Sequence, residues 1–204
     1  MLVGVYLTKD LTGITGGSFL GVSTTAWAVL AIADAVIHQI YVWFCWRAEL
    51  YNQALTRWFG GKAFVLYATL FTILFVARPL IAFSLGWANR GTLGLDPWLG
   101  YGISLVLFLP VVFMVYSIIN YFSFRRAFGI DHFDPALQNA PLIRQGIFRW
   151  SPNSMHVFGF FALWILAFLF QSVTALVIAG FSHAYIWVHY FATEKPDMVR
   201  IYRK

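Results

Sequence analysis

The sequence predicts an all-α integral membrane protein with about five transmembrane helices and a helical hairpin at its C-terminal end. Sixty per cent of its 204 residues are hydrophobic and only 11% are charged, and the mean hydropathy is +0.72. The apolar residues gather in long runs, and about 20 of them in a helix cross a hydrocarbon core of roughly 30 Å. Because a soluble domain needs a larger charged surface, we expect residues 1–204 to form a single transmembrane domain.

The first crossing is expected at about 24–46. The preceding residues 1–21 lack the basic, apolar and small-residue regions of a cleaved signal peptide and are interpreted as a short lead-in. Within the crossing, Asp34 and His38 lie four residues apart and therefore share one helix face. Ionisable groups at this depth face the bundle or a cavity, so the pair is either a polar clamp between helices or part of a substrate pocket.

The second crossing is expected at about 63–87, after a polar loop at 47–62. Arg78 and Pro79 lie inside it. Proline leaves one backbone carbonyl without its usual partner, and an arginine can supply donors, so the pair indicates a kink. The alternative that we keep is a site for a phosphate headgroup.

The third crossing is expected at about 98–122, after a loop at 88–97 that is rich in turn-forming residues. The longest polar segment follows at 123–150. Its charges are mixed in sign and prolines interrupt it, so we expect a loop with one interfacial turn.

The last two crossings are expected within the run 157–192, which is almost uncharged and too long for a single crossing. Gln171 and Ser172 interrupt it, which leaves two arms of roughly 17–20 residues. A hairpin returns the chain to the membrane face that it left, and so it brings together the polar segments 144–159 and 193–204. We interpret their meeting point as the candidate active site.

The distribution of basic residues indicates the orientation. With five crossings, 11 of the 14 Lys and Arg residues fall on the side of the loops 47–62 and 123–150 and the C-terminus, and two fall on the other side. This predicts a non-cytosolic N-terminus and a cytosolic C-terminus and site, in a bacterial inner membrane or the endoplasmic reticulum. The net charge of +6 fits anionic lipid headgroups better than nucleic acid. The sequence leaves the oligomeric state open.

Other common chemistries find little support. None of the histidines forms an i, i+4 pair of the kind that binds metal, so no metal site is expected. They are His38, His132, His156, His183 and His189. The single Cys45 excludes an internal disulfide. No G-x-S-x-G, Walker or dinucleotide-binding pattern is present.

Both polar ends of the hairpin carry groups suited to ligand binding. The sequence Ser-Pro-Asn-Ser at 151–154 breaks the chain and then offers helix-capping side chains, with free amides that can bind an anion. At the other end Glu194 follows His189 and Tyr190, and Pro196 is expected to stop the helix. A carboxylate at this position suits a cationic ligand.

These ends carry a family resemblance. Gly-Ile-Phe-Arg-Trp-Ser-Pro-Asn-Ser-Met-His at 146–156, a long apolar stretch and Glu-Lys-Pro-Asp-Met-Val-Arg-Ile-Tyr at 194–202 resemble the membrane phospholipid methyltransferases. These include the phosphatidylethanolamine N-methyltransferases and, more distantly, the isoprenylcysteine carboxyl methyltransferases. The family pattern is Gly-Pro-Tyr-Arg, Arg-(Asn/His)-Pro-x-Tyr, a hydrophobic hairpin and Glu-Glu-Pro ending near Ile-Tyr. The resemblance covers 144–204 well, whereas 1–143 match only in hydropathy.

The resemblance implies a transmembrane scaffold at 1–143 and a catalytic hairpin at 144–204 that binds S-adenosylmethionine. By position, Asn153 takes the Asn/His place, His156 the Tyr place and Glu194 the first Glu. The implied cofactor-binding residues are Asn153, Met155, His156, Gly159, Tyr190 and Glu194.

The sequence departs from the family pattern at three positions. Pro152 stands in place of Arg, Ser154 in place of Pro, and Lys195 in place of the second Glu. A second acidic group therefore cannot come from Lys195, although Asp197 is nearby. These departures concern the substrate and the cofactor contacts more than the fold.

The implied activity is methylation of a membrane lipid, with phosphatidylethanolamine or its partly methylated forms as the leading acceptors. An amine must lose a proton before it attacks, and the candidate catalytic bases are His156, His189 and Glu194. Arg144 and Arg149 are candidates for holding the lipid phosphate. Alternatives that stay open are another lipophilic acceptor, such as a thiol or a prenylcysteine carboxylate, and a non-catalytic haem or quinone subunit.

Overall fold

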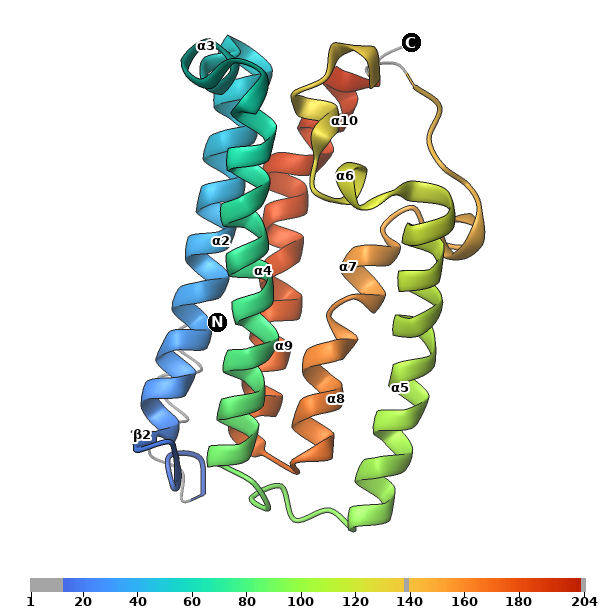
Figure 1. Ribbon diagram of the computed structural model, residues 1–204. Coiled ribbons are helices and arrows are strands. Elements are labelled where there is room, and N and C mark those ends of the chain that lie inside the picture. The colour runs from blue at the N-terminus through green and yellow to red at the C-terminus, as the bar shows by residue number, and fades with distance from the viewer. Residues whose placement is uncertain (1–12, 138–139, 203–204) are drawn as a thin grey trace.

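The computed structural model describes residues 13–137 and 140–202, and it is an all-α membrane bundle (Figure 1). Four helical stretches are long and apolar enough to cross a membrane: Thr24–Asn52, Ala54–Ala88, Pro97–Phe122 and Val173–Ile201. The segment Ser154–Leu169 is apolar but shorter. Among the described residues, β-structure is limited to a hairpin of β1 (Ser18–Phe19) and β2 (Val22–Ser23). We call the two ends of the bundle the β-hairpin end and the α10 end.

The three crossings expected from hydropathy are confirmed. They correspond to α2 (Thr24–Asn52), to α4 (Ala63–Ala88), and to α5 (Pro97–Ser117) with the π-helical turn Ile118–Phe122. The loop between α4 and α5 is also confirmed, and the carboxylate of Asp96 caps α5 by accepting from two backbone amides. Of the expected N-terminal lead-in, residues 1–12 lie outside the described part of the chain.

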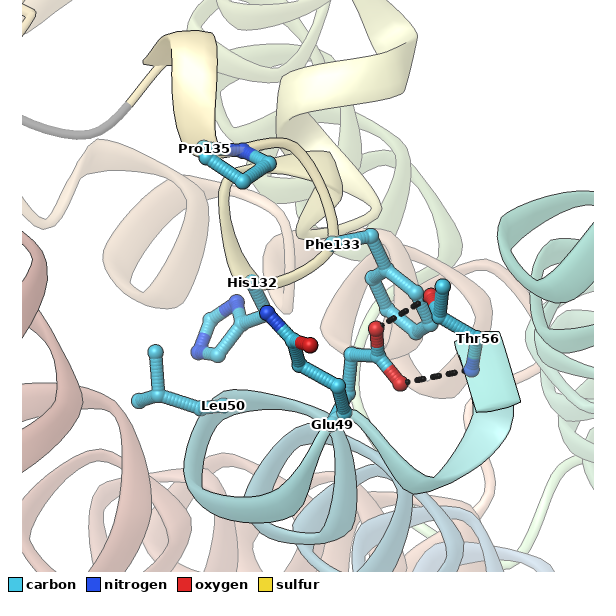
Figure 2. A pocket seen from close by; sticks show the side chains of 7 residues that line it. Glu49, Leu50, Thr56, His132, Phe133 and Pro135 are labelled. Carbon is cyan, nitrogen blue, oxygen red and sulfur yellow. Dashed lines mark hydrogen bonds between the residues drawn. The ribbon is translucent and has the colours of Figure 1, made fainter. Parts of the chain in front are cut away.

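The prediction of a loop at 47–62 is wrong, because this segment is helical. The helix α2 continues to Asn52, Gln53 has a positive φ of 49°, and α3 (Ala54–Phe59) and the 3₁₀ turn Gly60–Lys62 follow. The carboxylate of Glu49 accepts hydrogen bonds from the backbone N (3.0 Å) and Oγ1 (2.5 Å) of Thr56, which joins the two helices (Figure 2). The charges in this segment therefore do not mark an irregular backbone, and one of them, on Glu49, is buried.

The C-terminal hairpin is present, but its first arm is shorter than predicted. It consists of α7 (Ser154–Phe158) and α8 (Phe161–Leu169), which are separated at Gly159 and Phe160. A Cβ atom at Gly159 would lie 2.5 Å from the carbonyl oxygen of Met155, so the break is tightly packed. The expected arm of roughly 17–20 residues is therefore wrong. The turn falls near Gln171 as predicted, and α9 (Val173–His189) forms the second arm.

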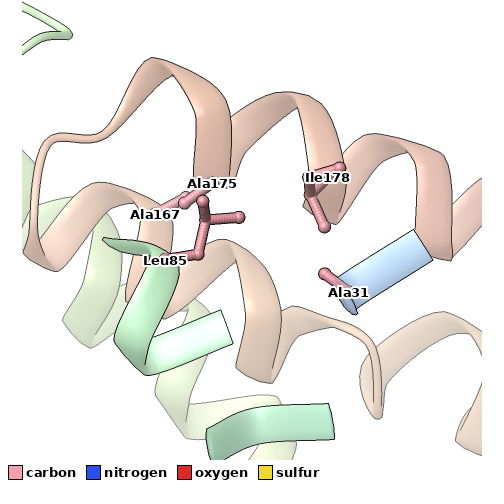
Figure 3. Packing of buried hydrophobic residues seen from close by; sticks show 5 residues of the cluster. All are labelled: Ala31, Leu85, Ala167, Ala175 and Ile178. Carbon is pink, nitrogen blue, oxygen red and sulfur yellow. The ribbon is translucent and has the colours of Figure 1, made fainter. Parts of the chain in front are cut away.

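The helices pack through small side chains where α2, α4, α8 and α9 meet (Figure 3). One buried cluster consists of Ala31, Leu85, Ala167, Ala175 and Ile178. Apolar burial drives association weakly inside a bilayer, so close contact between helix backbones contributes more, and alanine permits it.

A charged contact joins α2 and α4 in the middle of the bundle. Arg78 Nε lies 3.0 Å from Asp34 Oδ2, and Arg78 Nη2 lies 3.2 Å from His38 Nδ1. The helix α4 continues through Pro79. This arrangement supports the interpretation of Asp34 and His38 as a clamp between helices.

The β-hairpin end is closed by neutral hydrogen bonds around Asn89, which is 1% exposed. Its Nδ2 donates to the carbonyl oxygens of Gly13 (2.8 Å) and Gly16 (3.1 Å). Its Oδ1 accepts from Ser172 Oγ (3.0 Å) and from the backbone N of Thr174 (3.2 Å). One side chain thus joins the start of the described chain, the end of α4 and the start of α9.

The α10 end is formed by the polar segments. The region 123–150 contains more structure than the single turn expected: α6 (Phe124–Ala127) and the 3₁₀ turns Ile130–His132, Pro135–Leu137 and Gly146–Arg149. Figure 1 places α3, α6 and α10 (Lys195–Ile201) at this end. The prediction that Pro196 stops the helix is wrong, because a π-helical turn, Tyr190–Glu194, leads into α10 and Pro196 occupies its first turn, where proline is tolerated.

Candidate active site

The two polar ends of the hairpin meet at His156 and Glu194. His156 lies on α7, and its Nε2 is 2.9 Å from Oε2 of Glu194, the last residue of the π-helical turn Tyr190–Glu194. A π-helical turn inserts an extra residue into the helix and redirects the side chains that follow, and such turns recur at functional sites. The turn thereby aims a carboxylate from the end of one arm at an imidazole from the start of the other.

Aromatic rings surround this pair. The ring centroids of Tyr190 and Trp187 lie 5.5 Å and 5.8 Å from that of His156. The Nδ1 atom of His156 is buried and has no hydrogen-bond partner among the described residues. A carboxylate can only accept, so Nε2 carries the proton and Nδ1 keeps a lone pair that can act as a base. Aromatic faces next to a carboxylate form surroundings that favour a cation.

A second ionic group lies one helical turn further along, around Asp197. The side chain of Asp197 is fully buried, with Oδ1 3.1 Å from Arg47 Nε and Oδ2 3.5 Å from His132 Nε2. Arg47 also donates from Nη2 to the carbonyl oxygen of Ala192, at 3.0 Å. These contacts join α2, the 3₁₀ turn Ile130–His132 and α10.

The imidazole of His132 stacks on the indole of Trp46, with ring centroids 4.0 Å apart and planes 19° apart. Its Nδ1 lies 3.2 Å from the carbonyl oxygen of Gly129. The approach depends on Gly129, which has a φ of 83° and where a Cβ atom would lie 2.4 Å from the indole. The ring of His189 also lies 5.6 Å from the indole, centroid to centroid.

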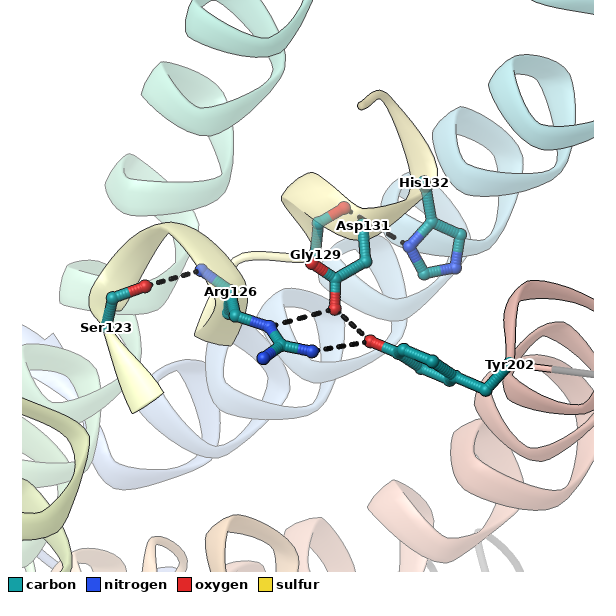
Figure 4. Close-up of polar contacts among 6 residues, drawn as sticks. All are labelled: Ser123, Arg126, Gly129, Asp131, His132 and Tyr202. Carbon is teal, nitrogen blue, oxygen red and sulfur yellow. Dashed lines mark hydrogen bonds and ion pairs between the residues drawn. The ribbon is translucent and has the colours of Figure 1, made fainter. Parts of the chain in front are cut away.

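A third group fastens the C-terminal segment to 123–137 (Figure 4). The hydroxyl of Tyr202 donates to Asp131 Oδ2, and it accepts from Arg126 Nη2 at 2.9 Å. Burial and the hydrogen bond to Asp131 raise the pKa of Tyr202 to about 12. Burial works against the charge of Arg126, but the hydrogen bond to Tyr202 and the charge of Asp131 outweigh it and raise the pKa of Arg126. This contact holds the turn that carries His132.

A hollow of about 140 Å³ opens beside His132 (Figure 2). It lies between the end of α2, the start of α3 and the segment 132–135, and its polar lining includes Glu49, Gln53, Thr56 and His132. A shallower groove of about 450 Å³ runs along the last turns of α2. Neither hollow includes His156 or Glu194.

The structure gathers some of the site residues expected from sequence. His156, Glu194 and Tyr190 lie together, and His189 is buried within electrostatic range of Glu194, His156, Asp197 and His132. The other expected cofactor residues lie along the start of the first arm. Asn153 precedes α7 but makes no side-chain capping bond, Met155 packs in an apolar cluster, and Gly159 lies at the break after α7.

The capping prediction for 151–154 is therefore wrong. Ser154 is fully buried, and its Oγ donates to the carbonyl oxygens of Ile147 (3.1 Å) and Ser151 (2.5 Å) instead of capping the helix. The serine fixes the turn before α7 and leaves Asn153 partly exposed.

The expected phosphate ligands Arg144 and Arg149 are exposed. They flank Ile147 and Phe148, which are buried against Met114 and Ile118 near the end of α5. Neither arginine forms an ion pair with a carboxylate in residues 13–137 and 140–202.

Sequence reasoning missed the group around Asp197. The sequence offers Asp197 only as an acid near Lys195, and it predicts no site role for Arg47, Trp46 or His132. Their contacts join residues that are far apart in the chain, so no local sequence pattern predicts these contacts. The one usable signal is that Asp197 follows Glu194 by three residues on a helix, which places both near one face.

A family model described as phospholipid methyltransferase matches residues 99–204. No curated protein and no solved structure matches the chain significantly. The matched region runs from the first turn of α5 to the C-terminus. It contains His132, His156, Glu194 and Asp197 but not Trp46 or Arg47, which lie on α2. In the described residues, no group of three or more His, Cys, Asp or Glu side chains is arranged to hold a metal ion.

Proposed function

This chain belongs to the phospholipid methyltransferase family, and we propose that it transfers a methyl group from S-adenosylmethionine to the nitrogen of phosphatidylethanolamine or one of its partly methylated forms. The observation that carries the proposal is the contact of 2.9 Å between His156 and Glu194. It joins a base and a carboxylate at the polar end of an apolar bundle, where a lipid headgroup can reach them while its acyl chains stay among the helices.

The residues present fit the proposed cofactor. S-adenosylmethionine supplies a methyl group bonded to a positively charged sulfur. Glu194 supplies a negative charge, and the rings of Tyr190 and Trp187 supply aromatic faces, which attract cations. The buried Nδ1 of His156 is a polar atom without a protein partner, as expected beside a ligand site. The rest of the proposed cofactor-binding site lies at the start of the first arm and consists of Asn153, Met155 and Gly159.

The roles of the two central residues follow from their geometry. Glu194 accepts a hydrogen bond from the Nε2–H group of His156 and so orients the ring. The Nδ1 atom is then free to take a proton from the lipid ammonium. A lipid amine is mostly protonated at neutral pH, as lysine is, and its protonated form cannot attack. The positive charge of a bound sulfonium would disfavour a second cation beside it and so help this deprotonation. Among the candidate bases, His156 is thus the proposed one.

We propose that Arg144 and Arg149 hold the lipid phosphate. Both are exposed on the segment that leads into α7, and guanidinium groups bind phosphate oxygens in pairs. We also propose that the α10 end faces the cytosol, since the basic residues gather there. The described basic residues at this end are Arg47, Arg57, Lys62, Arg125, Arg126, Arg144, Arg149, Lys195 and Arg200. The membrane is a bacterial inner membrane or the endoplasmic reticulum.

The experiment is a methyl-transfer assay with radiolabelled S-adenosylmethionine and the full chain in lipid vesicles. The acceptors are phosphatidylethanolamine, its mono- and dimethylated forms, a lipophilic thiol and a prenylcysteine. We expect label in the phospholipid nitrogen and a higher thermal midpoint with S-adenosylhomocysteine. Label only in the thiol or the prenylcysteine would favour the other acceptors. No transfer together with a haem absorption band would favour the haem subunit.

A further inference from the structure

Methylation of a lipid amine produces one proton in every cycle. The new N–C bond forms with the electron pair that the nitrogen keeps when its N–H proton leaves, and the pair of the broken S–C bond returns to sulfur. An ammonium thus becomes a methylated ammonium, and one proton must leave the protein before the next cycle. If His156 accepts this proton, it must pass the proton on to water through neighbouring groups, because the side chains of His156 and Glu194 are only 8% and 21% exposed.

His132 is arranged to accept a proton. The carbonyl oxygen of Gly129 can only accept, so Nδ1 of His132 carries the first proton. The lone pair of Nε2 then faces the carboxylate of Asp197 at 3.5 Å, and this atom is buried without a hydrogen-bond partner. A proton added at Nε2 would turn an unfavourable contact between two acceptors into a charge-assisted hydrogen bond.

Stacking favours the same protonated form. The indole of Trp46 lies 4.0 Å from the imidazole, centroid to centroid, and an aromatic face attracts a cation. Asp197, Trp46 and Gly129 thus act together on three sides of one ring. Histidine is the side chain that ordinarily gains and loses a proton near neutral pH.

Trp46 connects His132 to the proposed active site. The indole of Trp46 lies 4.0 Å from the ring of His132 and 5.6 Å from the ring of His189, which directly precedes the turn Tyr190–Glu194. His132 also lines the hollow of about 140 Å³ with Glu49, Gln53 and Thr56 (Figure 2). A hollow of this size with polar side chains in its lining can hold several water molecules.

We propose that His132, oriented by Asp197, receives the proton that the lipid amine loses and releases it to water in the hollow. His132 does not contact the reacting atoms, and Asp197 acts only by positioning its ring. The inference rests on the proposed function, since only a reaction that liberates a proton needs this path. The titratable and charged groups near His132 come from every element around it: Asp197, Arg47, Glu49, His189 and Asp131.

The test uses the full chain in vesicles of phosphatidylethanolamine and saturating S-adenosylmethionine. The variants are His132→Gln, which keeps a hydrogen-bonding side chain that cannot titrate, and His132→Ala, which leaves room for added imidazole. Arg57→Gln is the control, because it removes an exposed charge at the same end. The readouts are kcat and KM from pH 6 to 9, S-adenosylhomocysteine affinity, and the rate with increasing imidazole.

We expect both His132 variants to lower kcat by about ten- to hundred-fold while the affinity for S-adenosylhomocysteine stays within about twofold of the parent. Imidazole should restore part of the rate of His132→Ala, and Arg57→Gln should behave like the parent. If His132→Gln does not fold, Asp197→Asn replaces it. That variant should move the acid limb of the kcat profile to lower pH, because the imidazolium loses its carboxylate.

Two results would overturn the inference. One is a parent-like kcat and pH profile in the substituted protein. The other is a loss of rate that imidazole does not restore and that is matched by an equal loss of S-adenosylhomocysteine affinity, which marks a structural role. A parent protein that methylates no amine would instead contradict the proposed function itself.

Discussion

The two ends of the bundle both bury polar side chains, but they do so differently. At the β-hairpin end, Asn89 uses both its donor and its acceptor atoms in hydrogen bonds of 2.8–3.2 Å to neutral partners. At the α10 end, many of the buried groups are charged or titratable, and several of their atoms make no hydrogen bond, although Arg47 Nε and His132 Nε2 face Asp197 in ion pairs. The buried side-chain atoms without a hydrogen bond in the described residues are Gln39 Nε2, Arg47 Nε, Asp131 Oδ1, His132 Nε2, His156 Nδ1 and both Asp197 carboxylate oxygens.

We propose that the difference separates a structural end from a functional one. A buried polar atom without a hydrogen bond costs stability, and such an atom is expected where a ligand, water or proton transfer uses it. All but one of these atoms lie at the α10 end, where both π-helical turns, Ile118–Phe122 and Tyr190–Glu194, also occur. In the network around Asn89, the donor and acceptor atoms of this side chain are all used in hydrogen bonds, so none is free to bind a ligand. The network holds the loops together.

The largest expected effect comes from removing the charge of Glu194. Glu194→Gln keeps the size of the side chain but loses the carboxylate that orients His156 and favours cations. A charge-assisted contact contributes about 1.5–3 kcal/mol, so we expect methyl transfer to fall by roughly ten- to hundred-fold. Turnover and calorimetric titration of S-adenosylmethionine measure this effect.

Lys195→Ala is the matched control, one residue away. Lys195 is exposed, and its ammonium lies over the ring of Phe191 rather than near His156. This variant should keep nearly all of its activity. If Glu194→Gln binds the cofactor and turns over like the parent, the active site has been assigned to the wrong residues.

The opposite end should respond in the opposite way. Asn89→Ala leaves buried partners such as Ser172 and the amide of Thr174 without an acceptor, so we expect a loss of about 1–3 kcal/mol in the free energy of unfolding. Activity per folded molecule should stay close to that of the parent. Denaturant unfolding in detergent, together with a methyl-transfer assay on the folded fraction, measures both quantities.

Arg90→Ala is the control for this second comparison. Its guanidinium lies over the ring of the neighbouring Trp87 and is exposed. The variant should therefore change stability by a few tenths of a kcal/mol. A large loss of cofactor affinity in a stably folded Asn89→Ala protein would show that the β-hairpin end is not merely structural.

The contrast between the ends also explains what could be predicted. Hydropathy located α2, α4, α5 and the hairpin, because the thickness of a bilayer fixes the length of an apolar helix. The same reasoning predicted that His156 and Glu194 lie close together, since a hairpin must return to the membrane face that it left. These predictions depend on the period and length of apolar runs, which a single sequence displays directly.

The errors arose where geometry depends on contacts between distant segments. The helical form of 47–62 depends on the contact between Glu49 and Thr56 and on the positive φ of Gln53. The passage of the helix through Pro196 depends on a π-helical turn, for which the sequence carries no clear signal. The group of Arg47, His132 and Asp197 is assembled from α2, the segment 123–150 and α10, so only the tertiary structure reveals it.

The smallest expected effect concerns the contact between Tyr202 and Asp131, and it appears as a pH dependence. The pKa of Tyr202 is raised from 10.0 to about 12, so the folded state keeps the hydroxyl proton to higher pH than the unfolded state does. The hydroxyl therefore contributes its full stability below about pH 10, and this contribution is lost as the pH rises through about 12.

The variant Tyr202→Phe removes this contribution at every pH. At pH 8 the free energy of unfolding of the parent should exceed that of the variant by about 1 kcal/mol. This is below the usual range for a charge-assisted hydrogen bond, because Tyr202 is partly exposed. Thermal unfolding in detergent from pH 8 to 12 should show this gap closing between pH 10 and 12. The remaining tyrosines titrate equally in both proteins and cancel in the comparison. A gap that is absent at pH 8, or constant up to pH 12, would mean that Tyr202 does not fasten α10 to the segment that carries His132.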